Sequence, residues 1–355
     1  MKNILINLSN IKKGGGVQVA LTLLDELFNY LERYKIYVFL SEELFNMQFK
    51  RFNDVYYIKS KNNQIHNLFF LKKNEKKLNI DTVFSLFGPG IWKPKTTHIS
   101  GFAIPHLIYP DSPFFLRKKT ALSFRLLIQK LMFLRNIDKY IVESEDSKLR
   151  LSSIMKIKKE NIFIVSNTYN QKFDNIDYKL KLPSNKYKIF CPTSYYPHKN
   201  LEILLNVDEK ISLNNENIQI FATINSEVFD KIFSKCINVI NLGPIDLNKL
   251  TVKYSEMDLV LSTSLLECFS ANYIEAFKSK TPLLTTDLDF STSICKNAAM
   301  YYKCNDSMDL YNKIIHLKSN FQLSKKLITN GEEILNDYET PKSRIEKYFK
   351  IIDEI

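Results

Sequence analysis

Short apolar runs of strand character alternate with helical periodicity along the first half of the chain. The helical pattern is clearest from Val17 to Leu31 and from about Phe124 to Leu134. Strands that alternate with helices are typical of a parallel α/β sheet. The strand-like runs are Asn3 to Leu8, Ile36 to Leu40, Val55 to Ile58, Thr82 to Leu86, His98 to Phe102, Tyr140 to Val142 and Ile162 to Val165.

The pattern begins again after a polar, linker-like segment, residues 170–186. We therefore predict an α/β protein with two Rossmann-like, doubly wound domains, residues 1–169 and 187–335, that face one another across a cleft. Residues 336–355 form a helical segment that we expect to pack back toward the first domain. The second set of strands is Tyr187 to Cys191, Ile218 to Ala222, Val239 to Leu242, Leu259 to Leu261 and Leu283 to Thr285, with helices at Leu201 to Ser212, Leu247 to Met257 and Ala271 to Lys280.

Length and composition agree with this prediction. A chain of 355 residues, 45% hydrophobic and 25% charged, fits two folded domains of ordinary size. No apolar run approaches the roughly 20 residues that cross a bilayer, and the start reads as a strand, so we expect a cytoplasmic protein. The five cysteines are odd in number and lack CxxC spacing, which indicates reduced thiols rather than a disulfide framework or a zinc site.

The net charge of +12 predicts a polyanionic partner: nucleic acid, a phosphate-bearing metabolite or an anionic membrane. No motif that reads a nucleic-acid groove is present, so charge alone supports that class. An aromatic and basic helical pattern from Phe124 to Arg135, preceded by the segment 113–119, could rest on an anionic leaflet. A core helix with a solvated basic face explains the same pattern.

Glu267 and Glu275 lie where a strand pattern changes to a helical one that opens near Ser270. At this junction of a parallel sheet, the strand's carboxyl end and the helix N-terminus present unpaired N–H groups to a ligand. An anion binds well there. We expect one glutamate to meet a sugar hydroxyl and the other a ribose, although a glutamate early in a helix can also be a simple dipole partner.

Three further positions follow strand ends. Lys199, in a stiff loop after the first strand of the second domain, could act as a point charge on a diphosphate. The turn Gly14 to Gly16 opens the first helix and lets a ligand approach Gly15 and Gly16, but it lacks the GxGxxG spacing of a dinucleotide site. His106, and less strongly His98, could hydrogen-bond a sugar or phosphate at the carboxyl end of a first-domain strand.

Together these residues resemble the retaining glycosyltransferases of family 4, which have the GT-B fold, and especially the bacterial members that build capsule, O-antigen and lipopolysaccharide glycans. The resemblance implies that Glu275 holds the nucleotide ribose and that Glu267 contacts the donor sugar at the reacting face. Lys199 matches the phosphate lysine. The amides of Phe269 and Ser270 would bind the diphosphate or the sugar, and His106 matches a first-domain histidine near the transferred sugar.

The chain departs from the family at several positions. Ser194 stands where the family commonly has an arginine, so one phosphate cation of the donor site is missing or comes from elsewhere. Cys268 and Ser279 replace glycines, and Asn167 is followed by Thr168 instead of glycine. These changes concern phosphate binding more than the fold.

The resemblance implies a retaining hexosyltransferase that moves a sugar from a nucleotide-diphosphate sugar to a hydroxyl of a growing, lipid-linked glycan, with possible peripheral contact to an anionic membrane. We expect no cofactor and no metal, because Asp287 and Asp289 follow a strand and suit a helix cap better than a metal site. A sugar-nucleotide epimerase or hydrolase of the same fold is the alternative.

Overall fold

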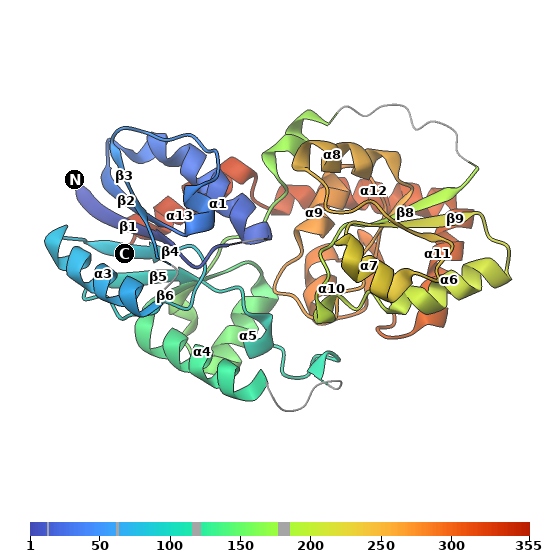
Figure 1. The fold of residues 1–355 in the computed structure, drawn as a ribbon, viewed down its shortest axis with the longest axis horizontal. Helices are drawn as coiled ribbons and strands as arrows, with labels where there is room; N and C mark the ends of the chain where they lie inside the picture. The colour runs from blue at the N-terminus through green and yellow to red at the C-terminus, as the bar shows by residue number, and fades with distance from the viewer. Residues whose placement is uncertain (13, 62–63, 116–121, 177–184) are drawn as a thin grey trace. The chain divides into compact units, whose positions relative to one another are not determined.

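The structure is a computed structural model that describes residues 1–12, 14–61, 64–115, 122–176 and 185–355. It divides into two compact units, each with its own parallel sheet (Figure 1). The first unit comprises Met1–Pro110, Lys118–Ser166 and Glu339–Ile355, and the second comprises Asp111–Arg117 and Asn167–Tyr338. Part of the predicted linker, residues 177–184, lies outside the described residues.

The first unit is built on a parallel sheet in the order β3-β2-β1-β4-β5-β6-β7. The order reverses direction between β1 and β4, which makes their carboxyl ends the switch point where ligands bind in such sheets. All seven predicted strands of this half are present. They are β1 (Lys2–Leu8), β2 (Tyr34–Leu40), β3 (Val55–Lys59), β4 (Thr82–Ser85), β5 (Thr97–Gly101), β6 (Lys139–Val142) and β7 (Ile162–Ile164).

Helices cover both faces of this sheet, and its central strands are therefore almost completely buried: β4 throughout, and β5 in all but its first residue. The helices are α1 (Gly15–Glu26), α2 (Glu42–Phe45), α3 (Gln64–Lys77), α4 (Leu122–Asn136), α5 (Glu145–Met155) and α13 (Pro341–Asp353), with 3₁₀ turns η1 (Leu27–Tyr30), η2 (Pro105–Leu107) and η4 (Lys159–Asn161).

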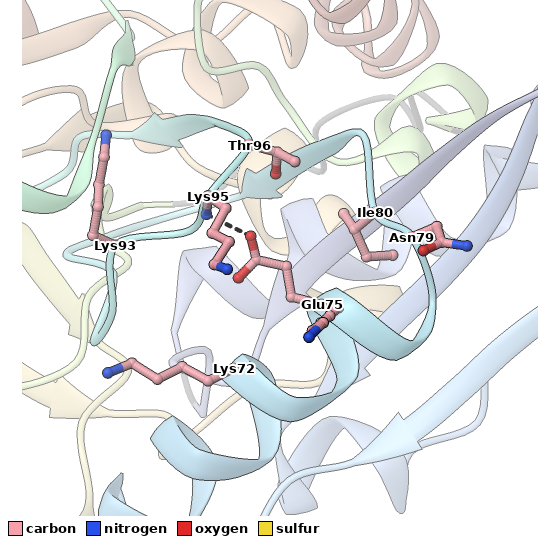
Figure 2. A pocket seen from close by; sticks show the side chains of 8 residues that line it. Lys72, Glu75, Asn79, Ile80, Lys93, Lys95 and Thr96 are labelled. Carbon is pink, nitrogen blue, oxygen red and sulfur yellow. Dashed lines mark hydrogen bonds between the residues drawn. The ribbon is translucent and has the colours of Figure 1, made fainter.

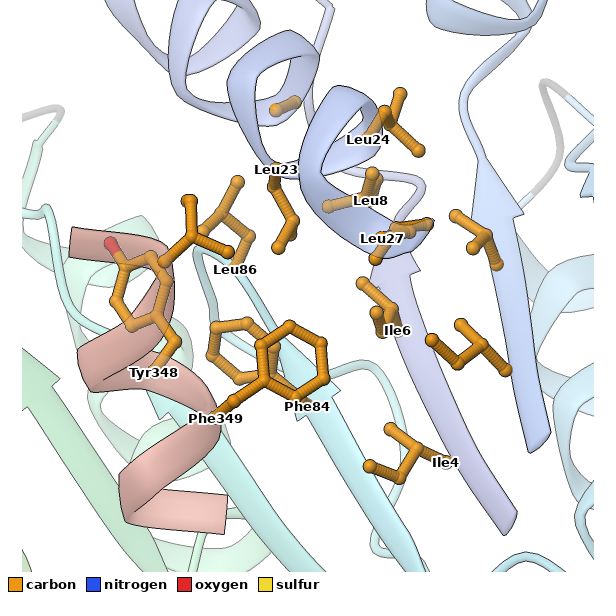
Figure 3. Close-up of a cluster of buried hydrophobic side chains, with 14 of the residues drawn as sticks. Ile4, Ile6, Leu8, Leu23, Leu24, Leu27, Phe84, Leu86, Tyr348 and Phe349 are labelled. Carbon is orange, nitrogen blue, oxygen red and sulfur yellow. The ribbon is translucent and has the colours of Figure 1, made fainter. Parts of the chain in front are cut away.

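The last helix, α13, completes the core of the first unit. Its Tyr348 and Phe349 are buried beside Ile6 of β1 and Leu23 of α1 (Figure 3). The ring of Phe349 stacks on that of Tyr30, with centroids 3.5 Å apart. Burying a large apolar side chain stabilises a fold by about 1.5–3 kcal/mol, so this helix is an integral layer of the unit and not an appendage.

The second unit repeats the plan with a sheet in the order β10-β9-β8-β11-β12-β13, whose switch point lies between β8 and β11. Five of these strands are predicted above, and the edge strand β13 is not. The strands are β8 (Tyr187–Cys191), β9 (Ile218–Ala222), β10 (Val239–Asn241), β11 (Leu259–Leu261), β12 (Leu283–Thr286) and β13 (Ala299–Tyr302). The helices are α6 (Ile203–Leu213), α7 (Ser226–Phe233), α8 (Leu247–Glu256), α9 (Ala271–Lys278), α10 (Asp289–Cys295), α11 (Ser307–Ser319) and α12 (Phe321–Ile334), with η5 (Gln171–Asn175), η6 (Pro197–Lys199) and η7 (Leu335–Asp337).

Candidate active site

Two loops meet at the switch point of the second sheet. The first follows β8 and ends in η6, and the second follows β11 and leads into α9. The backbone N–H of Leu265 donates to the carbonyl of His198 at 2.8 Å, and the Thr263 hydroxyl donates to the carbonyl of Lys199 at 2.6 Å. Since β8 and β11 are paired, these bonds fix the two loops against each other above adjacent strand ends.

Lys199 and Glu267 form an ion pair between these loops. Lys199 Nζ lies 2.6 Å from Glu267 Oε1, and the Ser264 hydroxyl donates to the same oxygen at 2.6 Å. The two charged side chains are 16% and 11% exposed, so both remain within reach of a ligand while their positions are held. A cation and a carboxylate thus stand side by side before any substrate arrives, which is the preorganisation that electrostatic catalysis requires.

The N-terminus of α9 lies directly after Glu267. Ser270 is the N-cap residue with an extended backbone, as the sequence predicts, and Ala271 begins the helix. The first amides of a helix have no intrahelical acceptor and carry partial positive charge. The Phe269 ring is buried and stands edge-on to Tyr338, with centroids 5.7 Å apart, which anchors the backbone just before the helix.

Glu275 occupies a different environment from Glu267. It is buried in α9 and accepts a hydrogen bond of 2.8 Å from the Tyr254 hydroxyl. Burial raises the pKa of Glu275 to about 7, and the Tyr254 bond acts in the opposite direction. Tyr254 is itself fully buried, with its ring edge-on to Phe173 and Phe190. One oxygen of Glu275 is therefore bonded to a side chain in the core of the unit.

A short segment that the sequence places in the first domain belongs to the second unit and supports both loops. The Ser112 hydroxyl donates to the carbonyl of Leu265 at 2.7 Å, and the Phe114 ring stands edge-on to His198, with centroids 6.2 Å apart. Ser112 and Phe114 are buried. No periodicity or motif in the sequence marks them, although they reach residues beside Lys199 and Glu267.

The glycine turn of the first unit follows β1, at that sheet's own switch point. Gly14 has a φ of 76°, a conformation that L side chains rarely adopt, and is the glycine that the turn requires. Gly15 and Gly16 open α1. A Cβ on Gly15 would meet nothing within 4 Å, and one on Gly16 would make ordinary contacts with Phe87 at 3.6 Å. The space beside Gly15 is therefore open to a ligand.

The two histidines have different positions. His106 lies in η2, after the carboxyl end of β5, where burial and then the charge of Arg125 lower its pKa. His98 is the second residue of β5, at its amino end, so the prediction that it lies at the carboxyl edge is wrong. It is fully buried between Ser85 Oγ at 2.8 Å and the Asn136 carbonyl at 2.7 Å, and burial lowers its pKa to about 4.

The remaining predicted positions are exposed. Ser194 lies in the loop after β8, which also contains Lys199. The N-cap of α10 is Leu288, between Asp287 and Asp289, so the prediction that an aspartate is the cap residue is wrong; Asp289 is the first helical residue. Among the residues that the structure describes, no group of three His, Cys, Asp or Glu side chains could hold a metal ion.

One face of α4 exposes a row of apolar side chains. The exposed fractions are 72% for Phe124, 53% for Leu127, 43% for Ile128, 43% for Leu131 and 41% for Leu134. These positions recur at the spacing of one helical face. The basic stretch that precedes α4, residues 116–121, lies outside the described residues. Within the described ranges, no helix has both the length and the apolar content needed to cross a membrane.

Comparison with known proteins connects the second unit to a family of transferases. Residues 172–334 match the family described as glycosyl transferases group 1. The O-antigen chain mannosyltransferase RfbU of Salmonella typhimurium is 23% identical over 210 residues, 56% of this chain and 54% of that protein. The chain therefore spans about half the length of this curated relative.

Solved structures agree on the architecture. Sucrose-phosphate synthase of Thermosynechococcus elongatus is similar with a TM-score of 0.81 at 14% identity, covering 100% of this chain and 99% of that one. Alr3699/HepE of Anabaena, solved in complex with UDP and glucose, is similar with a TM-score of 0.69 at 12% identity, covering 100% of both chains. At these identities the likeness shows the fold, which is the GT-B fold with two Rossmann-like units.

Proposed function

We propose, from the match of residues 172–334 to the group 1 glycosyl transferases, that this chain transfers a sugar from a nucleotide-diphosphate sugar to a hydroxyl of a growing glycan. The observation that carries the proposal is the Lys199–Glu267 pair beside the N-terminus of α9. The pair and the helix N-terminus together supply a cation, a carboxylate and helix N-terminal amides at one switch point, and all three suit sugar transfer from a diphosphate.

In the reaction, the bond from the sugar's anomeric carbon to the diphosphate oxygen breaks, a bond to the acceptor oxygen forms, and the acceptor hydroxyl passes its proton to the departing diphosphate. Negative charge grows on the diphosphate while positive charge grows on the sugar ring. Lys199 and the α9 amides face the negative charge on the diphosphate, and Glu267 faces the positive charge on the sugar ring. Removing one such preorganised group lowers kcat about 10²–10³-fold.

Other residues complete the donor site in this proposal. Glu275 holds the ribose with the oxygen that Tyr254 leaves available, and Ser194 contributes a hydroxyl beside the diphosphate. Gly15 and Gly16 leave room for the acceptor or the transferred sugar, and His106 contacts that sugar. Retention of the anomeric configuration follows from the resemblance to family 4. No metal ion is needed in this proposal, because Lys199 and the α9 amides offset the charge of the diphosphate. Activity that survives EDTA agrees with metal independence, and loss that Mn²⁺ restores contradicts it.

The acceptor in this proposal is lipid-linked, as suits the O-antigen mannosyltransferase to which the chain is similar. The exposed apolar face of α4 would rest in the headgroup region of an anionic leaflet. The charged side chains of the helix, Arg125, Lys130 and Arg135, are all basic, which complements anionic lipid. Vesicle binding that weakens when Leu127 and Leu131 become glutamine agrees with this contact, and unchanged binding contradicts it.

The test of transfer uses labelled UDP-, GDP- and ADP-sugars with and without a bacterial lipid-linked glycan acceptor. Label that enters the acceptor, and falls about 10²–10³-fold in Glu267→Gln, supports the proposal. Label that appears as an epimer or as free sugar at the same rate without acceptor favours an epimerase or hydrolase instead. Wild-type transfer by Glu267→Gln would show that the site is placed wrongly.

A further inference from the structure

A cavity of about 480 Å³ lies in the first unit at the edge opposite its glycine turn (Figure 2). Its walls come from the end of α3, from residues just before β4 and from residues just before β5. In a parallel sheet these positions mark the amino ends of the strands, whereas the glycine turn and His106 follow carboxyl ends. The cavity is therefore separate from the positions assigned to sugar transfer.

Four of the lining residues are lysines: Lys72, Lys76, Lys93 and Lys95. Lys93 pairs with Asp138, and Glu75 contributes one carboxylate to the lining. The cavity and its nearest partners thus hold two more positive than negative charges. All four lysine side chains are exposed, so an entering anion can recruit them without breaking a buried structure.

Glu75 belongs to the wall of the cavity. It is buried, and its Oε1 accepts the backbone N–H of Lys95 at 2.5 Å while its Oε2 accepts Trp92 Nε1–H at 3.4 Å. Figure 2 shows the Glu75 carboxylate turned toward Lys95, and the dashed line marks that bond. The carboxylate holds the segment that carries Lys95, so it does not compete with an anionic ligand for the space in the cavity.

A buried hydroxyl on the same wall has no partner. Thr96 Oγ1 is shielded from solvent and, among the described residues, makes no hydrogen bond. A buried polar group left in this state destabilises the fold. Thr96 lines the cavity, and rotation about its Cα–Cβ bond would turn the hydroxyl toward a ligand oxygen placed among the lysines.

From the charge excess, the volume and the unpartnered hydroxyl, we infer that this lysine cavity binds a phosphate group. A phosphate dianion matches two excess positive charges and offers several acceptor oxygens to lysine and threonine donors. A volume near 480 Å³ suits one small phosphorylated molecule or one lipid headgroup. The inference goes beyond sugar transfer, since no residue of the cavity has a role in that proposal.

Trp92 gives this site its own readout, because it is the one tryptophan of the chain and its ring nitrogen bonds to Glu75. Titration with inorganic pyrophosphate, followed by tryptophan fluorescence, should give a saturable response in the wild type. The double variant Lys72→Gln/Lys95→Gln should weaken pyrophosphate binding at least tenfold. The control Lys325→Gln/Lys326→Gln, on the exposed face of α12, should leave pyrophosphate binding unchanged. Lys199→Met should also leave it unchanged, which separates this site from the donor site.

Thr96→Val tests the hydroxyl at nearly constant volume. We expect weaker pyrophosphate binding and no loss of thermal stability, since the variant removes an unpartnered polar atom. A clear loss of stability would show that Thr96 already has a partner in the fold, and would remove that part of the evidence. A fluorescence response that is absent from the wild type, or equal in the cavity and control variants, would overturn the inference.

Flotation with vesicles of phosphatidylglycerol and phosphatidylcholine in equal parts distinguishes the two sources of phosphate. The protein used carries Leu127→Gln and Leu131→Gln, so that α4 does not dominate binding. If the cavity variant loses pyrophosphate binding and also vesicle binding, the natural ligand is a lipid headgroup. If it loses pyrophosphate binding alone, the ligand is a free phosphorylated molecule.

Discussion

Replacing Glu275 with glutamine should make the protein more stable at alkaline pH and less able to bind its donor. Burial raises the pKa of Glu275 from 4.5 to about 7. Between these values the folded state holds a proton that the unfolded chain releases, so stability falls as the pH rises through this window and is lowest above pH 7. At about 1.4 kcal/mol for each pKa unit, the full effect is about 3 kcal/mol.

Glutamine resembles the protonated carboxyl, because its amide oxygen can still accept the Tyr254 hydroxyl. Glu275→Gln should therefore match the wild type near pH 4.5 and exceed it by about 3 kcal/mol above pH 8, a rise of roughly 5–10 °C in the melting temperature of a unit of this size. Circular dichroism melts across this range measure the change. Trp92 fluorescence reports the first unit separately.

The exposed Glu209, on α6, provides the control, and Glu209→Gln should change stability little at any pH. In the same samples, if Glu275 holds the ribose as proposed, loss of its charge should weaken donor binding by about tenfold or more. A Glu275→Gln protein that is no more stable than the wild type at pH 8.5 would refute the burial argument. A stabilised variant with undiminished donor affinity would refute the ribose assignment alone.

Three further changes test the site. Lys199→Met should raise the donor KM and lower kcat together, because in the proposed site the lysine meets the diphosphate in both the bound donor and the transition state; unchanged kinetics would contradict this. Gly15→Val should leave the melting temperature within about 1 °C yet reduce transfer, whereas Gly14→Val, at a φ of 76°, should destabilise the first unit by about 1 kcal/mol or more. Ser112→Ala, which removes the bond to Leu265, should slow turnover several-fold with little change in donor affinity. Ser112→Thr, which keeps a hydroxyl, should restore the turnover rate. Equal rates in the wild type and both variants would mean that the segment does not position the loops.

The sequence identifies the parts of this fold that depend on local pattern. Runs such as Tyr187–Cys191 are rich in apolar residues that end in a buried stretch, because helices cover both sheet faces, and they are therefore easy to recognise. The edge strand Ala299–Tyr302 is shorter and half-buried in its middle, so its pattern is weak. Lys199 and Glu267 lie 68 residues apart, and their meeting follows from the rule that strand ends at a switch point share one edge.

Other features depend on tertiary contacts that no local pattern records. Ser112 and Phe114 lie in an irregular segment, and only the folded chain brings them to Leu265 and His198. The apolar run around His98 predicts the strand correctly but not which end the histidine occupies. The pattern near Glu275 predicts its place in the helix, whereas its partner Tyr254 comes from a different helix.

The return of α13 to the first sheet has a consequence for biosynthesis. Ile6 and Leu23, which begin the first core, are synthesised before the second unit, whereas Tyr348 and Phe349, which close that core, are synthesised after it. The second unit, whose described segments end at Tyr338, can therefore assemble while the first still has an uncovered apolar face. Nascent chains stalled before Pro341 should therefore recruit chaperones through the earliest part of the polypeptide.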